Sequence, residues 1–156
     1  MPGEREAQSF INAISGTVDA ILACLDDLTV DEINWRPPVP APNTLAIIAI
    51  HSQGNVAQNV LELLGGQEVD RVREEEFLTA GDVADRARQR WRELRVQIAE
   101  TIAACDDATW DRELHHPMTD QMMTGRELLL LVHRHAAEHL GEAQMIKDLI
   151  LVRRAG

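Results

Sequence analysis

The residues of this sequence best suited to chemistry are two histidines four positions apart, His135 and His139. They fall within the apolar stripe of a segment with helical periodicity, and residues four apart share one face of a helix. Two imidazoles one turn apart are what a zinc-type ion takes from a single helix. Histidines at this spacing also occur by chance as hydrogen-bonded core residues. The pair alone therefore leaves both a metal site and a buried structural pair open.

A third histidine, His51, lies on a second predicted helix at a change of polarity. Apolar residues precede it on its face, and Gly54, Asn55 and Gln58 continue that face toward the C-terminus. Gly54 leaves room, and the two amides could bind a ligand or water. This pattern predicts that His51 borders a polar cavity inside a bundle. If the two helices face each other, the three histidines form one site.

The remaining histidines are weaker candidates. His133 precedes His135 by two positions, a rotation of about 200° on a helix, so it should point away from the site. His115 and His116 fall in the connection 105–123, and nothing in their spacing shows whether they line the site's mouth. That connection is long for a helical bundle, and such loops are often functional.

Four segments carry the apolar spacing of amphipathic helices. They predict an all-α fold, a four-helix bundle that forms a single domain over residues 1–156. Thr29 and Thr124 each precede a glutamate by three positions, the capping-box pattern. The charged stretch Glu68–Glu76 is expected to be a solvated loop. The expected helices cover about residues 4–28, 43 or 44–64, 81 or 82–104, and 124–152.

The composition excludes several classes of function. A formal net charge of −11 disfavours binding to nucleic acid and to anionic membranes. No stretch is long enough for a transmembrane helix, and the first residues show no secretory pattern. The two cysteines, Cys24 and Cys105, are expected to be reduced thiols in a cytoplasmic protein.

Two stretches of the sequence resemble the DinB/YfiT-like family of metalloenzymes. Residues 135–142, HAAEHLGE, look like the family's His-x-x-x-His-x-Gly-[Gln/Glu/His] signature. Residues 34–51, which run from Asn34-Trp35-Arg36 to His51, look like its approach to the second helix. Pro117-Met118-Thr119 resembles the subgroup that contains the N-terminal domain of the mycothiol-dependent maleylpyruvate isomerase. The resemblance covers about residues 5–152.

The resemblance implies a four-helix bundle of unusual handedness, often a homodimer, with one three-histidine site for zinc, nickel or a similar divalent ion. Carried onto this sequence, the ligands are His51, His135 and His139. Similar proteins include transferases and isomerases that use a low-molecular-weight thiol as cosubstrate. Glu142 stands where the family often has glutamine. It could be a fourth ligand, an acceptor for an imidazole N–H, or an exposed carboxylate, and of these we expect the last.

Three functional hypotheses follow. The first is a metal-dependent enzyme with a small-molecule substrate, either a thiol-dependent S-transferase or isomerase or a hydrolase. Asn55, Gln58 and Glu142 are its candidates for binding substrate or supporting the ligands. The second is a non-catalytic module that binds metal or a small ligand in a stress response. The third is a bundle whose histidines are merely buried.

Overall fold

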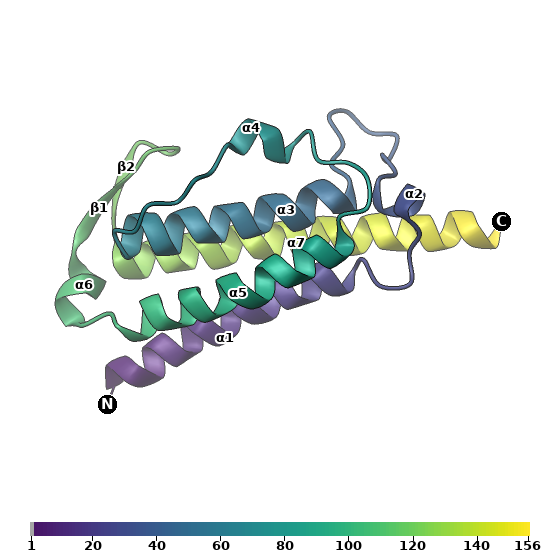
Figure 1. Cartoon of the computed structure of the whole chain (residues 1–156). Coiled ribbons are helices and arrows are strands. Elements are labelled where there is room, and N and C mark those ends of the chain that lie inside the picture. Colours follow the sequence, from purple (N-terminus) through teal and green to yellow (C-terminus); the bar gives the residue numbers. More distant parts are fainter. Residues whose placement is uncertain (1) are drawn as a thin grey trace.

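The computed structural model describes residues 2–156, and the long helices of this part pack side by side as the predicted four-helix bundle (Figure 1). None of the helices described is long and apolar enough to cross a membrane. The bundle consists of α1 (Pro2–Ala23), α3 (Leu45–Val56) with its continuation η1 (Ala57–Leu64), α5 (Ala84–Ala103) and α7 (Gly125–Ala155).

The bundle core is built from aliphatic side chains of all four helices. α7 contacts both α1 and α3, while α5 contacts α1 and η1. Residues such as Ile14, Ile48, Ile98 and Leu128 are fully buried where these helices meet. Burial of such side chains from water provides the main stabilising free energy. The contact between α3 and α7 matters most for function, because it brings His51 toward His135 and His139.

Threonine caps begin three of the helices. Thr29 and Thr124 form the predicted capping boxes, each with the glutamate three residues later, at the starts of α2 (Val30–Ile33) and α7. Thr44 accepts a hydrogen bond from the backbone of Ile47 and begins α3. The predicted end of the first helix near residue 28 is wrong. α1 ends at Ala23, and the chain turns through Asp27, which has φ of 62°.

The second half of the predicted second helix is a π-helix. η1 has hydrogen bonds that span five residues rather than four, as from the Gly65 N–H to the Val60 carbonyl. π-helical turns are rare and occur mostly at functional sites. Gly66, the second residue after the end of this helix, has φ of 69°, the left-handed conformation that the paired glycines predict.

The segment between η1 and α5 crosses the outer side of α3 as a strap (Figure 1). It contains a single helical turn, α4 (Arg73–Glu76). The prediction of a solvated loop here is wrong at two residues, because the side chains of Arg71 and Glu76 are only 4% and 7% exposed. The strap therefore packs a carboxylate against the bundle.

The connection predicted as a loop, 105–123, contains regular structure. It forms α6 (Asp107–Asp111), followed by β1 (Glu113–His116) and β2 (Gln121–Thr124). The strands pair antiparallel with Glu113 opposite Thr124, and His116 opposite Gln121. The fully buried Trp110 stacks on Phe10 of α1 and anchors this hairpin to one end of the bundle.

Candidate metal centre

The structure brings His51, His135 and His139 together between α3 and α7. One nitrogen from each ring lies within 4.8 Å of those of the other two. The ring centroids of His135 and His139 are 4.6 Å apart, as expected for residues one turn apart on α7. His51 faces both from the opposite helix, at centroid distances of 5.4 and 5.0 Å. The assumption that the two helices face each other is therefore correct.

The facing nitrogens of His51 and His135 are spaced as two ligands of one ion would be. Their Nε2 atoms are 3.2 Å apart. Two nitrogens bound to the same tetrahedral zinc ion at the usual bond length are separated by about 3.3 Å. Three neutral imidazoles form a donor set that suits zinc and nickel, so the residues present fit a divalent ion of this kind.

His51 is held in one tautomer by a buried carboxylate from the strap. Its Nδ1 lies 2.8 Å from Oε2 of Glu76, and both side chains are almost fully buried. Because Glu76 is ionised, Nδ1 carries the proton and donates it, which leaves the lone pair of Nε2 directed at the other two histidines. Metal-binding histidines typically have such a carboxylate behind them, which fixes the ring and raises its basicity.

Arg71 holds Glu76 in this position. Its Nε and one terminal nitrogen each donate to the carboxylate at 2.8 Å, and the other terminal nitrogen donates to Gln58 at 2.6 Å. Burial by itself would raise the pKa of Glu76, but the hydrogen bonds from Arg71 and His51 outweigh it and lower the pKa below its ordinary value. The carboxylate is therefore charged at neutral pH and can orient His51.

Gly54 provides the space in which this carboxylate lies. A Cβ atom at that position would be 1.9 Å from Oε1 of Glu76 and 3.0 Å from Nε of Arg71. Both distances are shorter than van der Waals contact, so any other residue would displace the pair. The predicted room beside His51 is thus filled by a carboxylate of the protein itself.

His139 has a carboxylate partner of its own on the same helix. Its Nδ1 lies 3.0 Å from Oε2 of Glu142, whose other oxygen accepts a hydrogen bond from Asn43 at 2.8 Å. These hydrogen bonds, that of His139 first, lower the pKa of Glu142 against the effect of its partial burial. The side chain of Glu142 is 36% exposed, but it is more than an exposed carboxylate, because it accepts a hydrogen bond from the imidazole of His139, the second of the three alternatives.

His135 completes the cluster as a neutral imidazole. Burial, together with the charges of His139, His51, Arg71 and Arg73, lowers its pKa to about 4. At neutral pH its ring nitrogen is therefore unprotonated and available as a ligand, which metal binding requires.

A pocket of about 220 Å³ opens beside the cluster, lined in part by His51 and His135. The predicted substrate-binding residues Asn55 and Gln58 both lie on its wall. η1 and the hairpin turn close one side, where the buried His116 places Nε2 3.0 Å from Oδ1 of Asn59. The pocket is large enough for a small molecule and gives it access to two of the three histidines.

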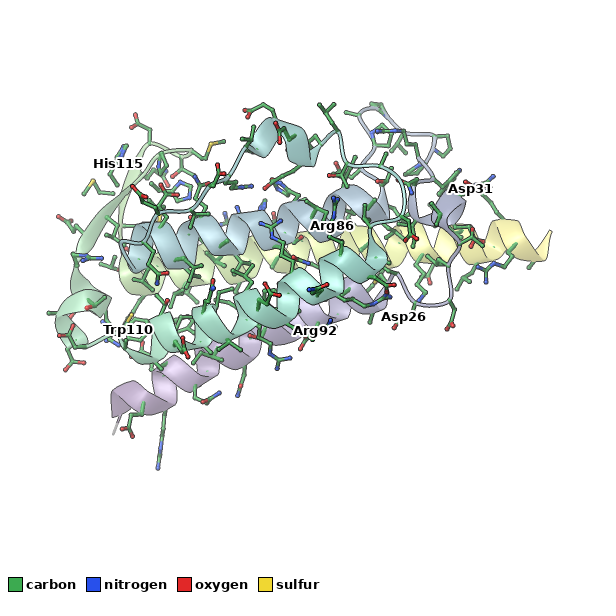
Figure 2. All side chains as sticks on the ribbon, in the orientation of Figure 1. Asp26, Asp31, Arg86, Arg92, Trp110 and His115 are labelled. Carbon is green, nitrogen blue, oxygen red and sulfur yellow. The ribbon has the colours of Figure 1, made fainter. Side chains whose placement is uncertain are left out.

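Other candidate residues lie outside this site. His133 lines a separate hollow against α1, as its rotation on the helix predicts. His115, labelled in Figure 2, is exposed on the hairpin and pairs with Asp120. Cys24 and Cys105 are free thiols whose pKa values are raised by burial, and neither lines the pocket.

Two residues of the site, Glu76 and Arg71, were missed by the sequence analysis. Both lie in a charged stretch whose composition resembles that of solvated loops. The one feature of the sequence that could have indicated a buried group beside His51 is Gly54. A glycine inside a helix costs stability, and its presence beside a candidate ligand indicates that another group approaches closely.

A solved structure and a protein-family model both agree with this architecture. No curated protein matches the chain. Among solved structures, YfiT from Bacillus subtilis superposes with a TM-score of 0.72 and 12% sequence identity, over 94% of this chain and 89% of that one. YfiT is described as a probable metal-dependent hydrolase with an unusual four-helix bundle topology. At this identity the likeness concerns the fold. The model of the DinB superfamily matches residues 13–143, most of the sequence, and the chain therefore belongs to the DinB superfamily.

Proposed function

We propose that His51, His135 and His139 bind one divalent metal ion and that the protein is a metal-dependent enzyme for a small-molecule substrate. The observation that carries this proposal is the arrangement of the imidazoles. Two of the three donate Nδ1–H to ionised carboxylates, which leaves the Nε2 lone pairs free on the side where the rings meet. Three protein ligands leave positions for substrate, which is typical of catalytic rather than structural zinc sites.

The chain's own residues would bind and orient the substrate, while the nucleophile would be a water molecule or the thiol of a cosubstrate. The pocket is lined by neither cysteine nor lysine among the residues that the structure describes. When bound, the ion would supply Lewis acidity and lower the pKa of a water or thiol nucleophile. Asn55 and Gln58 offer amide groups to the substrate, and Phe77, 4.8 Å from His51 between ring centroids, excludes water from one face of that ligand.

Two reaction classes fit this arrangement. In a hydrolase, water is the nucleophile, and YfiT supports that class by its description. In an S-transferase or isomerase, the nucleophile is the thiol of a low-molecular-weight cosubstrate, since neither Cys24 nor Cys105 lines the pocket. The two classes are separated by assaying the metal-loaded protein for ester and amide hydrolysis, and for conjugation of glutathione, bacillithiol or mycothiol to an electrophilic dye. Bound metal without turnover in either assay would favour a non-catalytic module.

Metal content tests the site itself. We expect plasma mass spectrometry of the untagged protein to find about one zinc, nickel or similar ion per chain, as a single three-histidine site requires. His51→Ala and His139→Ala should each lose most of it. His133→Ala is the matched control, because it removes a histidine of α7 outside the cluster and should retain the metal. Absence of metal from the wild-type protein after incubation with divalent ions would contradict the proposal.

A further inference from the structure

The pocket beside the histidine cluster has a charge opposite to that of the chain. The protein carries a formal net charge of −11, yet the charged residues on the pocket wall, apart from histidine, are Arg71, Arg73 and Arg134. No aspartate or glutamate lines the pocket within residues 2–156. A concave wall with charges of one sign concentrates ligands of the opposite sign. The pocket is therefore positive on the surface of an acidic protein.

Only two of these arginines have hydrogen-bonding capacity for a ligand. Arg71 is engaged by Glu76 and Gln58 and is nearly fully buried, so it holds the site together. Arg73 has no hydrogen bond or ion pair to any described residue. Arg134 has one long ion pair at 3.6 Å with Glu138, and both of those side chains are about two-thirds exposed. Such an exposed pair is weak and competes poorly with a ligand.

Arg73 is already oriented for binding. Its guanidinium lies 4.8 Å above the ring of Phe77, and that ring packs against His51. A guanidinium stacked on an aromatic face keeps its N–H donors free in its own plane. The stack thus places a cation at the pocket without a carboxylate to neutralise it.

Two neutral amide side chains share the pocket wall with the arginines and the histidines. Gln58 uses its Oε1 to accept from Arg71, which leaves its NH₂ group for a ligand. The side chain of Asn55 has no hydrogen-bond partner among the described residues, and both amides line the pocket. A molecule whose anionic group is bound by the arginines would also meet these amides, His51 and His135, because all of them line one pocket of about 220 Å³. The wall therefore combines cationic, neutral polar and metal-binding side chains.

We propose that the substrate or cosubstrate is a small organic anion whose carboxylate or phosphate group is bound by Arg73 and Arg134, with its reacting part toward His51 and His135. This inference rests on the proposed function for the identity of the reacting end. The anion-binding end depends on the arginines alone and is tested separately.

Binding of small probes to the full-length, zinc-loaded protein tests the proposal. The probes for isothermal calorimetry are succinate, glycerol 3-phosphate and succinamide, which is the neutral counterpart of succinate. We expect at least one anion to bind and succinamide to bind at least tenfold more weakly, since hydrogen bonds to charged groups contribute about that much. Comparison of the two anions identifies the anionic group. Equal affinity for succinate and succinamide, or no binding of either anion, would overturn the proposal.

Charge-matched variants locate the binding group. Arg73→Gln and Arg134→Gln should each weaken anion binding about tenfold, with metal content unchanged. Arg92→Gln removes the same charge from the far side of α5, away from the strap (Figure 2), where Arg92 faces α1, and should leave anion binding unchanged. Unchanged affinity in both pocket variants would refute the assignment.

The zinc-free protein separates this inference from the proposed function. If the anion binds through the arginines, affinity for it should fall in the zinc-free protein but remain measurable, and it should still depend on Arg73. If the anion binds only when zinc is present and equally in all variants, the metal alone attracts it and this inference is wrong. If no metal is found but Arg73-dependent binding persists, the proposed function fails and the anion site stands.

Discussion

At the scale of single residues, the candidate centre depends on Gly54 and Glu76. The glycine creates the space, and the carboxylate that fills it fixes the tautomer of His51. Neither residue is among the three proposed ligands, yet together they decide which nitrogen of His51 presents a lone pair. Mutation of a residue that orients a metal ligand typically lowers metal affinity by roughly 10–100-fold.

Gly54→Ala should therefore weaken metal binding by roughly 10–100-fold. The added methyl group would occupy the position of the Glu76 carboxylate and push it away from His51. The measurement is a competition titration with a chromophoric zinc chelator. Gly16→Ala is the control, because it adds the same methyl group to an exposed position of α1 with open space around it. Equal zinc affinity in Gly54→Ala and wild type would show that Glu76 does not orient the ligand.

At the scale of elements, the hairpin turn and η1 together form one wall of the pocket. They are joined by the buried contact between His116 and Asn59, and Thr119 donates its backbone N–H to Nδ1 of His116. Nδ1 is thus an acceptor and Nε2 the donor to Asn59. Burial lowers the pKa of His116, so the ring is neutral in this role.

His116→Ala should destabilise the protein by about 1–3 kcal/mol, because it removes a buried ring and leaves the amide oxygen of Asn59 without a partner. Urea denaturation measures this loss. The neighbouring His115 is the control, since it is exposed and pairs only with the exposed Asp120. His115→Ala should change the stability by less than about 0.5 kcal/mol. A similar small effect of both variants would mean that the hairpin does not depend on this contact.

The elements also show what the sequence could and could not predict. The helices, their threonine caps and the position of His135 and His139 on one face of α7 follow from local spacing, because helical period and capping are local properties. That His51 of α3 faces this pair is a tertiary contact, which the sequence analysis assumed. The burial of Glu76 depends on Arg71 and on Gly54 of another element, and no local pattern encodes such a contact. The π-helical turns of η1 were missed for a related reason: their apolar spacing resembles that of an α-helix.

At the scale of the whole molecule, the three imidazoles join α3 to α7, two of the long helices of the bundle. An ion that binds the folded chain and not the unfolded chain stabilises the fold by mass action, by about 4 kcal/mol at a thousandfold excess over its dissociation constant. Metal and fold should therefore be thermodynamically linked.

Removal of metal with a chelator should lower the Tm of the wild-type protein by about 10 °C, given the usual shift of a few degrees per kcal/mol for a chain of this size. Differential scanning calorimetry with and without added zinc measures it. His51→Ala should unfold at the same temperature in either condition, because it lacks a complete site. A chelator-insensitive Tm in the zinc-loaded wild type would contradict the link.

Two of the three proposed ligands belong to one helix, α7. His135 and His139 are one turn apart on α7, so the pitch of that helix fixes their relative position. His51 belongs to α3, and only the separation and rotation of α3 against α7 can still vary. Few degrees of freedom remain for the coordination geometry, and core side chains control them. Selectivity between ions of different preferred geometry is therefore a property of helix packing, and substitutions far from any ligand can retune it.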